Sequence, residues 1–177
     1  MELIGHLVPS EKEMEEYEKL RKSARKVEGK TISEWPKFEI NWDYSYENLH
    51  YFADGWALNT IVEKFPDGLM VADISLNDLD RKLTRGSCQK VHEFWDIGLR
   101  SKKSEAIAHW LNGGVMTPCK IAPHGTDEII ISGGHHRLAV CRAKSLQQLP
   151  VLFEPTHQAR LDEILKLKNI RIIQSST

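Results

Sequence analysis

One short stretch of the chain has residue types and spacing that suit the binding of an anion. Gly133 and Gly134 follow the apolar run 129–131 and precede the basic segment 135–144. An apolar run, a glycine pair and a helix-forming segment predict a strand, a tight turn and a helix. The glycines allow a ligand to approach the backbone, and the N–H groups of a first helical turn favour negative charge. The pattern predicts an anion site where the helix begins.

Three side chains in this stretch add chemistry to the predicted site. Arg137 carries a guanidinium suited to phosphate, and His135 and His136 could donate to phosphate or transfer protons near neutral pH. The glycine spacing is neither G-x-G-x-x-G nor G-x-x-x-x-G-K-[ST], so neither the dinucleotide fingerprint nor the P-loop applies. On composition alone, an alternative stays open in which the glycines form only a turn and the histidines are surface residues.

A longer pattern around the glycine pair is similar to one superfamily. Residues 132–144, followed by Leu-Pro-Val at 149–151, resemble the G-H-H-R or G-x-x-R box of the ParB/sulfiredoxin superfamily. The helical segment 103–111 and the Gly-Gly turn with the strand after it, 113–121, are similar to the elements that precede this box. The resemblance covers about residues 69–153. It implies a small α+β fold of mixed-sheet type with a nucleotide-phosphate cradle at residues 133–137.

The resemblance also implies roles for individual residues. Lys103 falls where related proteins place a phosphate lysine, so it joins Gly133, Gly134, His135, His136 and Arg137 as an expected nucleotide-binding residue, and the last three are the expected catalytic residues. Sulfiredoxins carry their reactive cysteine where this chain has His135, which argues against sulfinic acid reduction. The chromosome-partitioning branch adds a helix-turn-helix domain that a chain of 177 residues is too short to hold. Plasmid-borne fertility-inhibition proteins of this fold resemble the chain in size and in lacking such a domain.

The implied activity is binding and hydrolysis of ATP or another nucleoside triphosphate, coupled to DNA binding or cleavage. Two other functions use the same cradle: a small-molecule kinase of the free-serine type, and a non-catalytic adaptor whose partner affinity changes with nucleotide. The expected partners are therefore the nucleotide, DNA, and a protein of a DNA-transfer or partition system.

A magnesium ion is expected to enter with the triphosphate, because Mg²⁺ prefers carboxylates, waters and phosphate oxygens. Asp78 and Asp80 are the candidate ligands, with Asp73 as a third carboxylate. The alternative is that these aspartates cap the short helix or turn expected at 77–83. The eight histidines show no H-x-x-x-H or H-E-x-x-H spacing, so a structural zinc site is not predicted.

Charge is unevenly distributed along the chain. The net charge is −1, so any contact with DNA must come from a local patch. Residues 80–103 hold seven basic and three acidic side chains. One groove is expected to serve both the nucleotide and DNA, and the expected DNA-binding residues lie on its rim: Arg81, Lys82, Arg85, Arg100 and Lys102. Binding through such a patch is expected to be weak, salt-sensitive and independent of sequence.

The cysteines favour a reducing compartment. Cys88, Cys119 and Cys141 give an odd count without a C-x-x-C motif, which argues against a disulfide framework. No apolar run reaches the roughly 18 residues of a membrane span, and the N-terminus lacks a basic signal-peptide region. We therefore expect a cytoplasmic protein. Cys141 is weighed as a nucleophile and is not favoured, because small buried cysteines are usually inert.

The elements that must position the site divide the chain at the turn 66–68. Residues 1–68 are expected to form a helical, aromatic-rich extension, with a helix from about 10 to 27, packed on a core of residues 69–177. Nine of the fourteen aromatic residues lie between Trp35 and Phe65, which favours a second small core or a lid. The alternative is a stacking platform for bases or a partner surface.

In the core we expect strands at 69–76, 115–122, 128–131, 149–153 and 170–173, and helices at 91–99, 103–111, 135–144 and 156–168.

Overall fold

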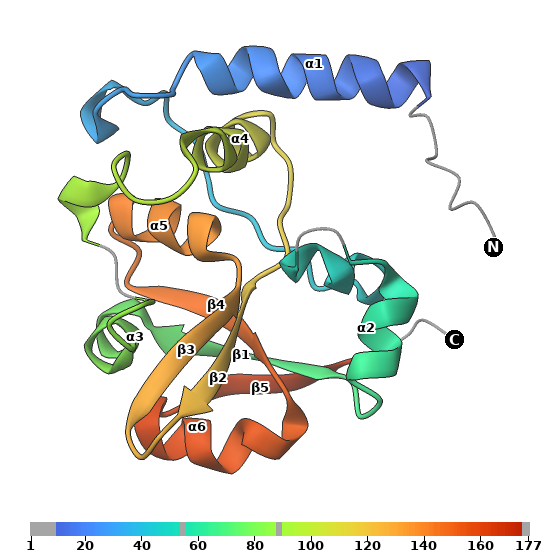
Figure 1. Cartoon of the computed structure of the whole chain (residues 1–177), viewed down its shortest axis with the longest axis vertical. Coiled ribbons are helices and arrows are strands. Elements are labelled where there is room, and N and C mark those ends of the chain that lie inside the picture. Colours follow the sequence, from blue (N-terminus) through green and yellow to red (C-terminus); the bar gives the residue numbers. More distant parts are fainter. Residues whose placement is uncertain (1–9, 54–55, 88–89, 175–177) are drawn as a thin grey trace, which may run out of the picture.

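The computed structural model of the protein describes residues 10–53, 56–87 and 90–174. A five-stranded mixed sheet lies at its centre, with strand order β3-β2-β4-β1-β5. β2 and β4 are parallel, and every other neighbouring pair is antiparallel. The strands are β1 (Leu69–Ser75), β2 (Cys119–His124), β3 (Glu128–Gly133), β4 (Gln148–Phe153) and β5 (Lys168–Ile173). The predicted α+β class is confirmed (Figure 1).

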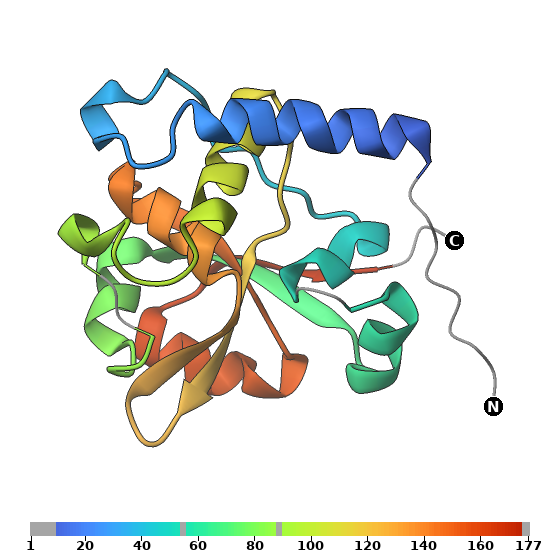
Figure 2. The same ribbon diagram turned by 45° about the horizontal axis from the view of Figure 1, so that its top comes forward.

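Helices surround this sheet. In both views α1, α4 and α5 lie one above another, so the chain's first helix is separated from the sheet by two others (Figures 1 and 2). The described helices are α1 (Glu11–Arg25), α2 (Leu58–Lys64), α3 (Leu76–Lys82), α4 (Arg100–Leu111), α5 (His135–Ala143) and α6 (Gln158–Leu165). Short 3-10 helices are η1 (Ile32–Glu34), η2 (Tyr46–Phe52), η3 (Val91–Glu93) and η4 (Pro155–His157). None of the helices in the described ranges is both long and apolar enough to cross a bilayer.

The main core follows from the alternation of side chains along the strands. On β1, Met70, Ala72 and Ile74 are buried in one cluster with residues of α3, α5 and α6. The alternate residues Leu69 and Val71 belong to a different cluster on the other face. Since successive strand residues point to opposite faces, both faces of β1 are covered. Ile129 and Ile131 of β3 and Leu138 of α5 belong to the first cluster, so this core anchors the two elements that flank the Gly-Gly turn.

The aromatic segment packs into two small cores. Trp35 joins buried residues of α4 and α5, with Phe38 and Trp42 packed against them. Phe52 joins Leu69, Val71 and Leu152 of the sheet, with Trp56 and Phe65 at the edge. The expectation that these aromatics serve packing is confirmed for seven of the nine, with two clusters where one was expected, whereas Tyr44 and Tyr51 are exposed. Residues of both predicted domains pack together in each cluster, and the division at residues 66–68 stays a prediction.

Three predicted elements differ in extent. The helix predicted at 91–99 is wrong: only Val91–Glu93 is helical, Gly98 has a φ of 78°, and the carbonyls of Phe94 and Ile97 accept hydrogen bonds from the Lys103 ammonium. The strand predicted from 115 begins at Cys119. The helix predicted at 156–168 ends at Leu165, because Lys166 adopts a left-handed conformation with a φ of 53°.

Candidate functional site

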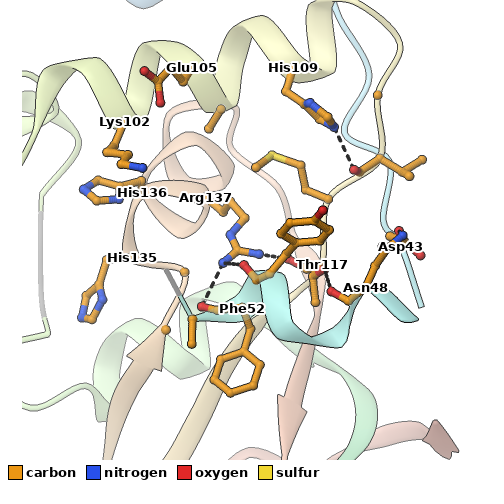
Figure 3. Close-up of a pocket in the computed structure, with 18 of the residues that line it drawn as sticks. Asp43, Asn48, Phe52, Lys102, Glu105, His109, Thr117, His135, His136 and Arg137 are labelled. Carbon is orange, nitrogen blue, oxygen red and sulfur yellow. Dashed lines mark hydrogen bonds between the residues drawn. The ribbon is translucent and has the colours of Figure 1, made fainter. Parts of the chain in front are cut away.

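A cavity of about 950 Å³ lies at the turn between β3 and α5. Its walls come from the Gly-Gly-His-His-Arg stretch, the exposed side of α4, the segment before β2, and residues 43–53 of the N-terminal extension (Figure 3). This volume is in the usual range for small-molecule sites. The predicted anion site is thus one wall of a cavity whose other wall comes from the N-terminal extension.

Both glycines are required by close packing. A Cβ on Gly133 would collide with the carbonyl oxygen of Phe52 in η2. Gly134 has a φ of 88°, and a Cβ there would lie 2.8 Å from the Cβ of Cys119. Side chains rarely adopt this φ, and atoms this close must move apart. The glycine pair therefore lets the extension and β2 approach the turn, in addition to exposing the start of α5.

The first turn of α5 has the features of an anion site. Gly134 is its N-cap residue and provides no side-chain cap, whereas α3 is capped by the Ser75 hydroxyl. His135 and His136 line the cavity beside this turn. Burial, followed by the positive charge of Arg142, lowers the pKa of His135 below its ordinary value. His135 is therefore neutral at pH 7, which is the form that accepts a proton.

Arg137 has a role that its sequence position did not suggest. Its side chain is only 6% exposed. Nη1 donates to the carbonyl of Thr117, and Nη2 donates to the carbonyls of Tyr51 at 3.0 Å and Phe52 at 3.2 Å. Arg137 thus joins α5 to the end of η2 and to the segment before β2. These bonds point to a clamp between the two walls of the cavity.

The neighbouring residues Lys103 and Lys102 lie in different environments, one buried and one exposed. Lys103 is 1% exposed, and its Nζ donates to the carbonyls of Phe94 and Ile97. Burial lowers the pKa of Lys103, an effect that Asp96 opposes. Lys102 instead is exposed, lines the cavity and lies beside His136 (Figure 3). The lysine that the structure brings to the expected phosphate position is therefore Lys102, which the sequence assigned to DNA.

The wall from the extension is a hydrogen-bonded turn. Asp43 accepts from the N–H and the hydroxyl of Ser45, at 2.8 and 2.6 Å, and from Asn48 Nδ2 at 2.6 Å. Burial acts to raise the pKa of Asp43, but the hydrogen bonds from Ser45 and Asn48 offset it and leave the pKa below its ordinary value. Asp43 is thus an ionised acceptor that holds the start of η2 in place.

Two further side chains of α4 face the cavity. Glu105 lines it and forms no hydrogen bond or ion pair within the described part of the chain. His109 Nε2 is 2.9 Å from the carbonyl oxygen of Val115 and holds the loop before β2 (Figure 3). Glu105 is therefore a carboxylate available to a ligand, whereas His109 is a support for the wall.

The expected magnesium ligands lie elsewhere. Asp80 accepts from Arg142 Nε at 2.7 Å, and Asp78 is 3.6 Å from the Arg81 guanidinium. The N-cap of α3 is Ser75, whose hydroxyl accepts from the N–H of Asp78, so the alternative in which these aspartates cap the helix is wrong as well. Neither aspartate lines the cavity. Among residues 10–53, 56–87 and 90–174, no group of three or more histidine, cysteine or acidic side chains is placed to hold a metal ion.

The expected DNA-binding cations fall into two sets. Arg81 and Lys82 belong to α3, with Arg85 shortly after it, whereas Arg100 and Lys102 belong to α4. In both views α3 and α4 lie on different sides of α5 (Figures 1 and 2). Three of these cations form ion pairs: Arg81 with Asp78, Lys82 with Asp127 and Arg100 with Asp96. The structure does not bring the five into one groove, and DNA binding stays a prediction.

The two described cysteines are buried in the main core and do not line the cavity. Cys119 and Cys141 are free thiols in the main core, and Cys88 lies outside the described residues. Burial raises the pKa of Cys119 to about 11 and raises that of Cys141 further, with Cys119 adding to the effect. Thiols with raised pKa values in a core are poor nucleophiles, in agreement with the expectation for Cys141.

Sequence reasoning missed the wall formed by residues 43–53. An Asp two residues before a Ser is a turn signal, but nothing in residues 43–48 indicates that this turn reaches the Gly-Gly stretch. The sequence does contain a signal that Lys102, and not Lys103, faces the cavity. Lys103, Ile107 and Trp110 have the spacing of one helix face, and Lys102, Glu105 and His109 have that of another. The buried face contains Trp110, so its lysine had to be the buried one.

The fold and the cavity define an α+β domain with a ligand-sized cavity at a helix N-terminus. No protein-family model matches the chain, and no curated protein matches it. The structure is similar to a crystal structure of Oncogenic Suppression Activity Protein, described as a plasmid fertility inhibition factor, in its gold(I) cyanide derivative. The TM-score is 0.48 at 11% identity, covering 86% of this chain and 87% of that chain. A likeness at this level assigns no function, and membership of the ParB/sulfiredoxin superfamily stays a prediction.

Proposed function

We propose that the cavity binds a nucleoside triphosphate, with the phosphates at the first turn of α5, and that the protein hydrolyses the terminal phosphate. The observation that supports this most is a cavity of about 950 Å³ in which Lys102, His135 and His136 line the uncapped start of a helix. Helix N-termini and lysines are suited to phosphate, and phosphoryl transfer depends mostly on positioning and on stabilising charge.

The chemical step needs one proton acceptor. A water oxygen attacks the terminal phosphorus, the bond to the bridging oxygen breaks, and the diphosphate leaves with that electron pair. Neutral His135 takes the proton of the attacking water, while Lys102 and His136 hold the phosphate oxygens. Magnesium would enter on the triphosphate itself, since Asp78 and Asp80 are bonded elsewhere, and no step here depends on it.

The test is an ATP titration by calorimetry combined with measurement of phosphate release. Lys102→Ala should weaken binding about tenfold, equivalent to about 1.4 kcal/mol, because a charge-assisted phosphate contact is lost. Arg100→Ala is the matched control, since Arg100 is two residues away and pairs with Asp96 at 3.8 Å. Binding without phosphate release would support the adaptor alternative. Absence of binding, or equal affinity in Lys102→Ala, would refute the proposal.

A kinase acting on a small hydroxyl compound is a second candidate, favoured by the unpaired carboxylate of Glu105 in the cavity. Such an enzyme needs a base for the acceptor hydroxyl near the terminal phosphate. The two functions differ in their products. Phosphoserine formed from ATP and free serine, and lost in Glu105→Gln, would support the kinase. Free phosphate formed at the same rate with and without serine would support hydrolysis.

A further inference from the structure

The wall formed by the extension carries a polar side chain with a fixed orientation. Asn48 lines the cavity, and Figure 3 places it across Arg137 from Lys102 and His136. Its Nδ2 donates to Asp43 at 2.6 Å, and its main-chain oxygen accepts from the Thr117 hydroxyl at 2.9 Å. Both the backbone and the side chain of Asn48 are therefore held in place.

The chemistry of Asp43 decides which end of the amide faces it. An ionised carboxylate only accepts hydrogen bonds, so the NH₂ group of Asn48 must point toward it. The oxygen Oδ1 of Asn48 then points elsewhere. Within the described ranges it accepts no hydrogen bond from the protein, and it is not among the buried atoms that lack a partner. Asn48 thus offers a solvent-reachable acceptor on the cavity wall.

An aromatic ring lies on the same wall. Tyr51 lines the cavity and is 61% exposed. Its carbonyl is held by Arg137 at 3.0 Å, and its ring centroid is 4.1 Å from that of His50. His50 is itself fixed, because Nδ1 is 2.9 Å from the carbonyl oxygen of Glu47. A braced, exposed ring gives a planar base a face on which to stack.

We propose that Asn48 selects the base of the nucleotide by accepting a hydrogen bond from an exocyclic amino group, so that the cavity prefers a 6-aminopurine or 4-aminopyrimidine nucleotide. This inference rests on the proposed nucleotide binding. A base with a carbonyl oxygen at that position would place this oxygen opposite Oδ1. Both atoms are acceptors, so no hydrogen bond could form between them. The amide cannot turn to donate, because Oδ1 would then face the Asp43 carboxylate. A site with such a fixed polar group rejects the wrong base through unpaired polar atoms.

Nucleotide pairs that differ at this group and at the adjacent ring nitrogen, which carries a proton only in the carbonyl member, provide the test. ATP and ITP differ by an amino group against a carbonyl oxygen on the purine, and CTP and UTP differ in the same way on the pyrimidine. In competition binding to the full chain, the amino member of at least one pair should bind at least about tenfold tighter, equivalent to about 1.4 kcal/mol. Measurable binding with equal affinities within both pairs would overturn this inference alone. No binding of any of the four would overturn the proposed function with it.

A variant then assigns the discrimination to the turn. Asp43→Asn preserves size but lets either end of the Asn48 amide face residue 43, so the ratio of the two affinities should fall toward one. Asp127→Asn is the matched control, since Asp127 pairs with Lys82 outside the cavity, and it should keep the wild-type ratio. A wild-type ratio in Asp43→Asn would overturn the inference. The comparison of ligands on the wild-type protein needs no variant to fold.

Discussion

The two walls of the cavity are built from distant parts of the chain by different means. The β3–α5 wall is a continuous stretch in which two glycines permit close packing. The Asp43–Phe52 wall is an irregular turn and a 3-10 helix held by side-chain hydrogen bonds. Arg137 of the first wall connects the two by donating to the carbonyls of Tyr51 and Phe52 in the second. The comparison teaches that the residue of the first wall best suited to bind phosphate, Arg137, instead forms hydrogen bonds that hold the second wall in place.

The largest expected effect is that of a side chain at Gly134. Gly134→Val should lower the free energy of unfolding by about 3 kcal/mol or more, from the strain at positive φ plus overpacking against Cys119. It should also abolish nucleotide binding. Urea unfolding measures the first effect and calorimetry the second.

Gly113→Val is the matched control for this variant. Gly113 has a φ of 78° but no atom within 4 Å of an added Cβ. Only strain remains, so the loss should be about 1–2 kcal/mol. Equal losses in the two variants would mean that close packing at the turn is unimportant.

Removal of the clamp comes next in size. Arg137→Ala leaves three carbonyl oxygens without their charged donor and should cost about 3 kcal/mol of unfolding free energy. Arg137→Lys should recover only part of this, because one ammonium cannot reproduce the guanidinium fork. Chemical denaturation of both variants tests this. A stable Arg137→Ala protein with weakened ATP binding would instead return Arg137 to the phosphate site.

The neighbouring lysines give a smaller and sharper contrast. Lys103→Ala leaves the carbonyls of Phe94 and Ile97 without their donor, and should cost about 2 kcal/mol of stability. Lys102→Ala should change stability by less than about 0.5 kcal/mol, because its side chain is exposed. Thermal unfolding of the pair measures both. The opposite ranking would contradict the assignment of the two helix faces.

The smallest expected effect is a pH dependence. The pKa of His135 is lowered on folding, so at pH values between the folded pKa and the ordinary value near 6.5 the unfolded chain binds more protons. The contribution of His135 to stability is therefore present above about pH 6.5 and is lost as pH falls through the folded pKa. The rate of phosphate release should likewise rise with pH, and it should reach its plateau before neutral pH because the pKa of His135 is lowered. His135→Gln should remove that rise, and an unchanged profile would exclude His135 as the proton acceptor.

The sequence predicted one wall of the site well and the other not at all. The strand, glycine turn and helix at 128–144 follow from local pattern, and β3 and α5 are found there. Whether a cation of that wall faces a ligand depends on tertiary packing, which places Arg137 against Tyr51 across 86 positions of sequence. The turn at Asp43 has a local signal, but its place beside α5 depends on contacts that no local pattern contains. The prediction of a helix at 91–99 was wrong because the carbonyls of Phe94 and Ile97 accept hydrogen bonds from the Lys103 ammonium, a contact that the local pattern does not contain.

The most direct test of the central claim is the position of the bound nucleotide. A two-dimensional ¹⁵N–¹H NMR titration of the full chain with ATP follows the backbone amides of Gly134, His135 and His136 together with the side-chain amide of Asn48. The account predicts that these signals from both walls shift with one common affinity, while amides of α3 near Asp78 and Asp80 do not. Shifts confined to α3, or to one wall only, would contradict it.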